Sequence, residues 1–200
     1  MKKIILVIFL FSSLACFAQD STEQKGFKKE NLFTGGSITL SFGNGTFQGG
    51  VIPHLGYSIT KWLDAGIVVN YIYTSYRDYQ VFNDKLRQTL YGGGVFTRVY
   101  PLRFLFAQAQ LEHNFINLKY LPPNGGSSEK SEVNATSFLV GAGYTTGRNP
   151  GSGRSYGYLA VLFDIMDDEN SPYRDNAGRV NPVIRAGFNI PLFQGRARNY

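Results

Sequence analysis

Cysteine, long hydrophobic runs and clustered basic residues are all scarce in this sequence of 200 residues. The one cysteine, Cys16, cannot form a disulfide within the chain or build a cysteine-based metal site. After residue 30, no apolar run reaches the roughly 18 residues of a transmembrane helix. The formal net charge of +6 is mild and its basic residues are scattered, which argues against nucleic acid as a partner.

The first segment has the three parts of a secretory signal peptide. A basic start, Met1-Lys2-Lys3, precedes an apolar run over 4–14, and Cys16-Phe17-Ala18 places small residues before a cut at Gln19. The run is too short to span a membrane as a helix. We therefore predict a signal peptide over 1–18 and a polar linker over 19–30, with lipidation of Cys16 as the alternative.

The remainder of the chain alternates between apolar and polar residues with period two. Its 23 glycines, 16 phenylalanines and 13 tyrosines favour strands and turns. The pattern predicts strands over 32–42, 47–59, 63–76, 86–100, 104–118, 133–146, 155–166 and 180–193. Long polar loops over 77–85, 119–132 and 167–179 then share one end with a hairpin at Asn44-Gly45. Shorter connections over 60–62, 101–103 and 147–154 share the other end.

The two faces of these strands differ in bulk and polarity. In the second strand Val51 and Leu55 share one face, and Gln48 and His54 share the other. An eight-stranded barrel has an interior just wide enough for side chains, so bulky apolar faces point outward and small or polar faces inward. The fold class predicted is all-β: a closed antiparallel up-and-down transmembrane β-barrel of eight strands. A secreted soluble barrel with its apolar face inward is the alternative.

Two sets of residues follow from this arrangement. The polar network predicted for the lumen comprises His54, Asp64, Arg98, Gln108, Gln110, Glu112, Asp164, Arg185 and Asn189. Aromatic residues near the strand ends predict two girdles at the membrane interfaces. Their members are Tyr57, Trp62, Tyr73, Tyr76, Tyr100, Phe115, Tyr120, Tyr144 and Phe193. The alternative is that these are core aromatics of a soluble domain.

Three segments resemble the small outer-membrane β-barrel proteins of Gram-negative bacteria, which include porin-like barrels. They are residues 53–66, residues 94–100 and the last strand around 185–191. The resemblance implies a single barrel over 31–193 in the cell outer membrane, reached through the periplasm, with both termini in the periplasm. It implies outer-membrane lipid and the barrel-assembly machinery as partners. Such barrels often end on an aromatic residue; here Phe193 is the equivalent, and a C-terminal tail over 194–200 follows it.

Candidate chemistry is sparse. His54, Ser58 and Glu112 are the residue types of a hydrolytic triad, but residues four apart on a strand are separated by about 13 Å. Ser37 and Ser41 are other possible nucleophiles. An acidic stretch could bind Ca²⁺, but its spacing matches no calcium loop; its residues are Asp167, Asp168, Glu169, Asn170, Asp175 and Asn176. No cofactor or metal site is predicted.

The function predicted is a structural or surface-interaction role, through extracellular loops that bind an unidentified ligand. The barrel is expected to be a monomer and not an enzyme. A narrow channel for small solutes, a lipid-acting enzyme such as an acyl hydrolase, and a secreted soluble ligand-binding barrel are the alternatives.

Overall fold

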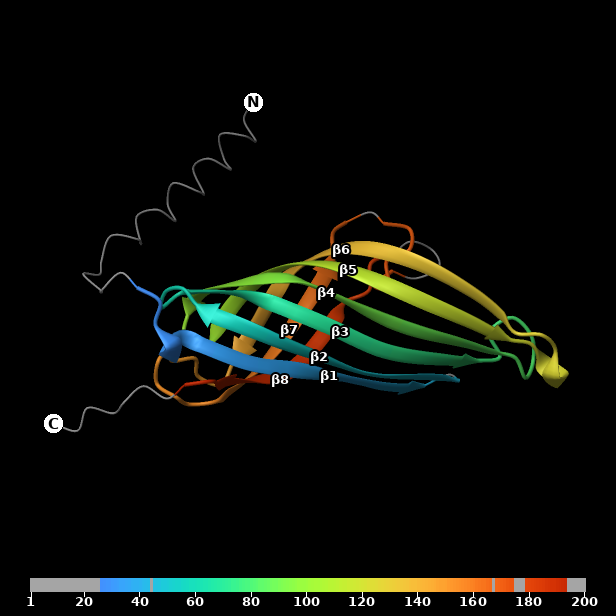
Figure 1. Cartoon of the computed structure of the whole chain (residues 1–200), viewed down its shortest axis with the longest axis horizontal. Helices are drawn as coiled ribbons and strands as arrows, with labels where there is room; N and C mark the ends of the chain where they lie inside the picture. Colours follow the sequence, from blue (N-terminus) through green and yellow to red (C-terminus); the bar gives the residue numbers. More distant parts are fainter. Residues whose placement is uncertain (1–25, 44, 167, 175–178, 194–200) are drawn as a thin grey trace, which may run out of the picture.

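The computed structural model describes residues 26–43, 45–166, 168–174 and 179–193. Eight antiparallel strands follow one another round a closed barrel, and β8 pairs with β1 (Figure 1). The strands are β1 (Leu32–Gly43), β2 (Thr46–Ser58), β3 (Leu63–Arg77), β4 (Lys85–Leu102), β5 (Leu105–Leu121), β6 (Glu129–Thr145), β7 (Tyr156–Asp164) and β8 (Val183–Pro191). The predicted all-β, closed, eight-stranded up-and-down barrel is confirmed.

Within the described ranges, two short 3-10 helices accompany the strands: η2 (Lys29–Asn31) and η3 (Pro123–Gly125). Among the described residues, none of the helices has the length and apolar character needed to cross a membrane. The predicted signal peptide with Cys16, most of the linker and the tail over 194–200 lie outside the described residues.

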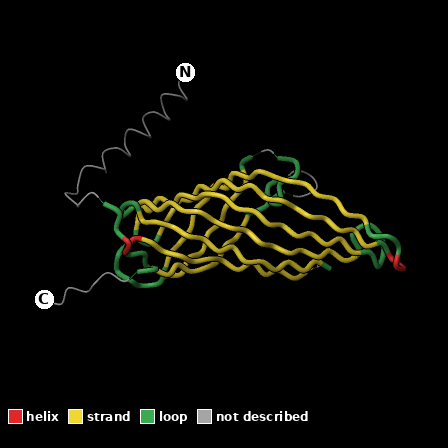
Figure 2. The backbone as a smooth tube through the Cα atoms, in the orientation of Figure 1, coloured by secondary structure: helices red, strands yellow, loops and turns green. Residues whose placement is uncertain are grey.

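The wall of the barrel is much taller on one side than on the other (Figures 1 and 2). Strands β4, β5 and β6 have 18, 17 and 17 residues, whereas β7 and β8 have nine each. The long-loop end, which carries connections 78–84, 122–128 and 165–182, therefore rises beyond β7 and β8 on the β3–β6 side. The short-turn end carries connections 59–62, 103–104 and 146–155, and the described chain enters and leaves there (Figure 1).

The predicted loop over 119–132 was too long, because strands occupy both of its ends. β5 runs to Leu121 and β6 begins at Glu129. In these extensions the alternation continues: Leu118 and Val133 pack inward against the core, while Lys119 and Lys130 lie on the outward face. The lysines made the segment look like a solvated loop, but they occupy only one face of a sheet.

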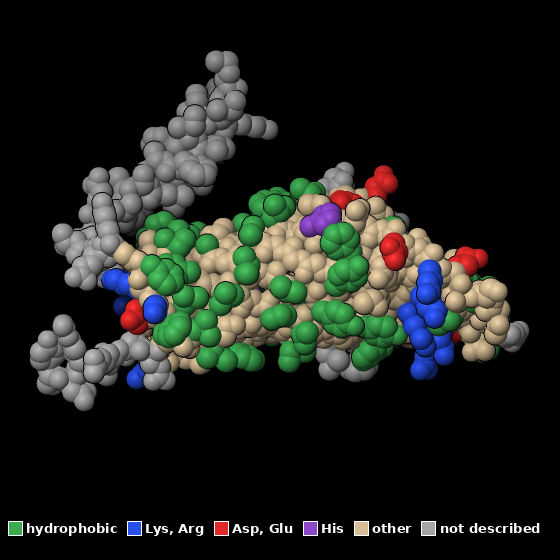
Figure 3. Space-filling view, viewed as in Figure 1, with side chains coloured by type: hydrophobic (Ala, Val, Ile, Leu, Met, Phe, Trp, Pro, Cys, Tyr) green, Lys and Arg blue, Asp and Glu red, His purple; other side chains and the backbone are tan. Residues whose placement is uncertain are grey.

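Side chains alternate strictly between the inside and the outside. In β5 every second residue from Phe106 to Ile116 is buried. The outward apolar side chains are exposed, as at Ile67 (55%), Leu111 (44%) and Ile184 (63%). They form a hydrophobic belt round the strands, part of which is seen as green patches in Figure 3.

The sequence predicted small and polar residues in the interior. The interior also contains large apolar side chains. Two buried apolar clusters include Phe33, Phe96 and Phe106. Each of these rings lies across from an inward glycine on the neighbouring strand. The pairs are Phe33↔Gly56, Phe96↔Gly66 and Phe106↔Gly143. A narrow barrel can hold these rings because the opposite position has no side chain.

Gly143→Ala is expected to destabilise the barrel by about 1–3 kcal/mol, the usual result of overpacking. A Cβ atom at Gly143 would lie 2.3 Å from Cζ of Phe106 and 2.5 Å from the carbonyl oxygen of Leu159. The matched control is Gly157→Ala on the outward face, where the nearest atom would be 3.7 Å away. Urea unfolding followed by the emission of Trp62, the single tryptophan, measures both variants. Equal stability of the two would contradict the packing described.

Candidate functional site

The structure places all nine residues of the predicted lumen network inside the barrel. Each is buried, with at most 6% of its surface exposed. They come from β2 to β5, β7 and β8, so closure of the sheet is what brings them together. The interior is therefore the candidate site.

A chain of hydrogen bonds runs along the inward face of β5. Arg98 Nε donates to Gln108 Oε1 (2.8 Å), and Gln108 Nε2 donates to Gln110 Oε1 (2.7 Å). Gln110 in turn donates to Glu112. Asn114 Nδ2 donates to Glu112 from the other side (3.2 Å). Residues two apart on a strand share a face, so alternation aligns the members on β5, and Arg98 joins them as the cross-strand partner of Gln108.

Glu112 is the centre of the network. Arg185 Nη2 on β8 donates to Glu112 Oε1 at 2.7 Å. The Tyr173 hydroxyl donates to Glu112 Oε2 at 2.7 Å. Tyr173 comes from the connection 165–182, so this loop inserts an aromatic side chain into the barrel. The sequence analysis did not identify Tyr173, because a loop residue carries no strand periodicity.

Connection 165–182 is also tied to the top of β7. Ser171 Oγ donates to Asp164 Oδ2 at 2.5 Å, and Asp164 Oδ1 accepts from the backbone N–H of Phe138 (3.0 Å) and Met166 (3.1 Å). Asp164 thus fastens the loop to β6 and β7 where these strands stop pairing. Through Tyr173 the same loop also fills part of the lumen beside Glu112.

The short-turn end is closed by Arg148, another loop residue that the sequence analysis did not identify. Its guanidinium donates to Asp64 at 3.0 Å and 2.5 Å, and it also donates to the backbone carbonyls of Thr60 and Lys61. The guanidinium carbon lies 4.2 Å from the ring centre of Tyr100. No periodic signal marks Arg148, because it lies in a run of Gly, Asn, Pro and Ser.

His54 lies in an aromatic environment and not in a triad. Its Nε2 is 2.5 Å from Asn189 Oδ1, and its ring contacts those of Phe33, Phe96 and Tyr158. Among the described residues neither His54 nor Glu112 forms a hydrogen bond with a serine. The grouping of His54, Ser58 and Glu112 that a hydrolytic alternative would need is therefore not assembled. The side chain of Ser41 is outside the described set, and that of Ser37 is buried.

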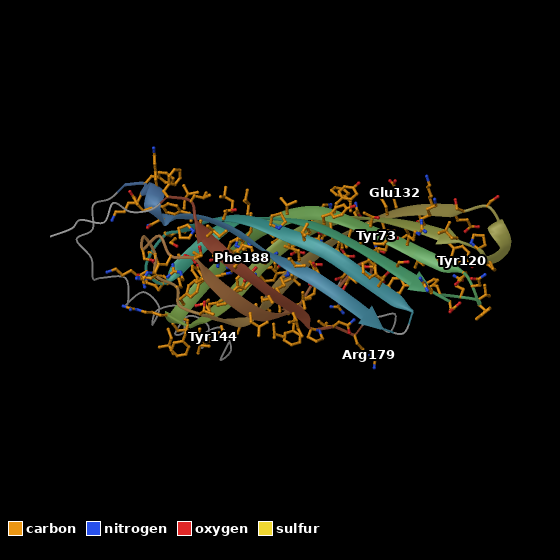
Figure 4. All side chains as sticks on the ribbon, turned by 90° about the horizontal axis from the view of Figure 1, so that it is seen from below. Tyr73, Tyr120, Glu132, Tyr144, Arg179 and Phe188 are labelled. Carbon is orange, nitrogen blue, oxygen red and sulfur yellow. The ribbon has the colours of Figure 1, made fainter. Side chains whose placement is uncertain are left out.

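The aromatic residues predicted for the girdles divide between the two faces. Tyr57, Tyr73, Phe115 and Tyr144 lie on the outward face, and Tyr73 and Tyr144 lie toward opposite ends of it (Figure 4). Trp62 is half-buried in a turn, and Phe193 is exposed after β8.

The prediction was wrong for Tyr76, Tyr100 and Tyr120, which occupy inward positions of their strands. Tyr76 lines a cavity in the long-loop half of the lumen, Tyr100 is buried at 4% exposure under Arg148, and the Tyr120 hydroxyl donates to Asp84. A position near the end of a strand places an aromatic ring in a girdle only when that position also faces outward.

Asp84 holds the connection 78–84 at the long-loop end. Its carboxylate accepts from the backbone N–H groups of Tyr79, Gln80 and Val81 and from Tyr120. Burial opposes ionisation of this carboxyl, but these four donors outweigh it and lower the pKa of Asp84 below its ordinary value. The loop is thereby organised around a carboxylate that stays charged.

A cavity of about 790 Å³ occupies the long-loop half of the lumen. Ile52, Ile72 and Leu90 provide its apolar lining, and polar groups come from Gln48, Thr74 and Gln88. Tyr173 and Arg185 are also in its lining. β1 and β8 pair only as far as Ile38↔Ala186, and both of these residues also line the cavity.

The acidic stretch is only partly described, because Asp167, Asp175 and Asn176 lie outside the described residues. Asp168 accepts from the backbone N–H of Thr136 (2.8 Å) and of Asn170 (3.0 Å). Over the described ranges, no three His, Cys, Asp or Glu side chains are grouped so as to hold a metal ion.

No known protein-family model matches the chain. A search of curated proteins finds no similar sequence either.

Glu112→Gln is expected to lower the free energy of unfolding by about 3–5 kcal/mol, because it leaves Arg185 charged and buried without its carboxylate. The double variant Glu112→Gln/Arg185→Gln is expected to lose less stability than the sum of the two single variants. Urea unfolding of the refolded chain in detergent micelles provides the comparison. Strict additivity would show that the two side chains are not coupled.

Proposed function

We propose that this protein is an integral β-barrel of the bacterial outer membrane, with a closed lumen and a structural or surface-interaction role at its long-loop end. One observation carries the proposal: a closed barrel has its charged groups inside and an uncharged apolar belt outside. The resemblance of three segments to small outer-membrane barrels agrees with it.

The dimensions of the belt support this proposal. The outward residues of β3 over 63–73 and of β5 over 105–115 carry no Asp, Glu, Lys or Arg. A membrane-spanning strand needs roughly 9–11 residues at a tilt of about 45°. Soluble monomers rarely expose contiguous apolar patches above a few hundred Å². A secreted soluble barrel would need a cover for the whole belt.

Leu111→Arg tests the membrane assignment. Leu111 is at the middle of the belt, where an outward arginine in a bilayer costs about 2–4 kcal/mol. The control is Asn117→Arg, on the outward face of the same strand but beyond the belt, with an expected cost of about 0–1 kcal/mol. Urea titration of the chain in phosphatidylcholine vesicles gives both values. Equal tolerance of the two arginines, with protein that stays in solution without detergent, would support the soluble barrel instead.

The side chains that fill the lumen argue against the channel alternative. Arg148 and Tyr173 insert into the barrel from opposite ends, and the hydrogen-bonded chain between Arg98 and Asn114 occupies its centre. The refolded chain is therefore expected to be silent in planar bilayers. Folding is checked by a gel band that shifts only on heating. Regular conductance steps from protein that passes this check would favour the channel.

The surface-interaction part of the proposal is supported by the cavity at the long-loop end. Its volume of about 790 Å³ is in the usual range of ligand pockets, roughly 300–1,000 Å³, and it combines apolar with polar lining residues. It is blocked toward the short-turn end by the packed network. A ligand would therefore bind there without crossing the barrel.

A further inference from the structure

Three basic side chains form a row across the outside of the tall wall. Arg87 on β4 is the direct cross-strand partner of Lys119 on β5, and Lys119 is the direct partner of Lys130 on β6. All three are at outward positions, beyond the hydrophobic belt toward the long-loop end. Figure 3 shows basic side chains gathered at this end. Arg87, Lys119 and Lys130 are called the basic row below.

The basic row is unfavourable by itself. Directly opposed side chains on antiparallel strands have Cβ atoms about 5 Å apart, and like charges at this spacing repel. Within the described ranges of the chain, none of the three forms an ion pair. The nearest acidic residue on this face is Glu132, two residues beyond Lys130 on β6. One carboxylate cannot neutralise three cations, so a bound external anion would relieve the repulsion along the row.

The position of the row in the wall indicates which anion. Tyr71, Tyr91 and Phe115 are direct partners across β3, β4 and β5, and the rings of Tyr91 and Phe115 stack at 5.6 Å. In a bilayer such aromatic rows lie at the interface with water. Arg87 lies four residues before Tyr91 on β4, about 13 Å away along the strand toward the long-loop end. The basic row therefore lies where the headgroups of the outer leaflet would be.

A shallow groove of about 300 Å³ runs along the row and supplies further donors. Thr89 and Asn117 line it together with the three basic residues, Tyr73 and Glu132. A guanidinium can bind a phosphate through two parallel hydrogen bonds, and lysines add point charges. The groove thus offers cations and neutral donors to a tetrahedral anion, with Glu132 as the one opposing charge.

We propose that the basic row binds the phosphate group of a membrane lipid in the outer leaflet. The inference rests on the proposed membrane location and adds the chemistry of a lipid partner. It commits to phosphate that is anchored in the bilayer, because the row lies on the outward face, on the long-loop side of an aromatic row. Binding there relieves the repulsion along the row and stabilises the extended ends of β4, β5 and β6.

The test compares two triple variants with the same change in charge. The row variant is Arg87→Gln/Lys119→Gln/Lys130→Gln. The control, Lys61→Gln/Arg103→Gln/Arg154→Gln, removes three exposed basic residues at the short-turn end. Each full-length protein is refolded in mixed micelles of phosphatidylcholine and phosphatidic acid, and native mass spectrometry counts the retained phosphatidic acid. The row variant is expected to retain about 100-fold less, from roughly 1 kcal/mol per basic residue, and the control to match the wild type.

A single substitution is expected to change the retention of phosphatidic acid in the opposite direction. Glu132→Gln removes the opposing charge and is expected to increase retention of phosphatidic acid. Equal retention by both triple variants would overturn the inference, as would displacement of the lipid by excess inorganic phosphate, which would indicate a site for a free anion. An alkaline wash of vesicles separates the two proposals. If the wild type itself is washed off, the membrane barrel is wrong and the lipid site with it. If all variants stay embedded after the wash, the membrane barrel stands, and the number of retained phosphatidic acid molecules tests the lipid site by itself.

Discussion

The small diameter of an eight-stranded barrel is the constraint on which the rest of the structure depends. Only side chains fit within it, so three of the large inward rings lie opposite glycines, and most buried polar groups need a partner within the lumen. The pairing of Phe106 with Gly143 meets the first requirement, and the hydrogen bonds from Arg98 to Asn114 meet the second. Inward glycines leave room for large rings, and inward amides satisfy one another by hydrogen bonds within the same narrow lumen.

The same constraint draws loops into the barrel. A buried ionised group is stable only when it is paired and hydrogen-bonded. The strands alone do not complete these pairs: Asp64 is paired by Arg148, and the environment of Glu112 is completed by Tyr173, both from connections between strands. Closure of the lumen is therefore a consequence of charge neutralisation as much as of shape. An open channel would leave these groups to water and to mobile ions.

Much of this architecture could be predicted from period-two alternation. The alternation predicts the number of strands and the closed barrel. It also predicts inward positions for residues such as Gln110 and Glu112, because the polar residues of each strand occupy one set of alternate positions. The alternation did not show where the polar strands end. Lys119 and Lys130 resemble loop residues, and only the inward positions of Leu118 and Val133 indicate that the strands continue. It also gives no information on Arg148 and Tyr173, whose positions depend on how loops fold back. Tyr100 lies near the end of its strand, as a girdle residue would, but its position on that strand faces inward.

The unequal wall connects the two candidate binding features. Beyond the point where β8 stops pairing with β1, the remaining strands β2, β3 and β4 still present alternate residues to two sides. Inward, Thr74, Gln88 and Leu90 line the cavity; outward, Arg87 begins the basic row on the same stretch of β4. One extension of the sheet therefore supplies both a pocket and an anion-binding exterior. Because β4 belongs to both, an anion bound outside would stiffen the wall of the pocket inside, and the two features are expected to depend on each other.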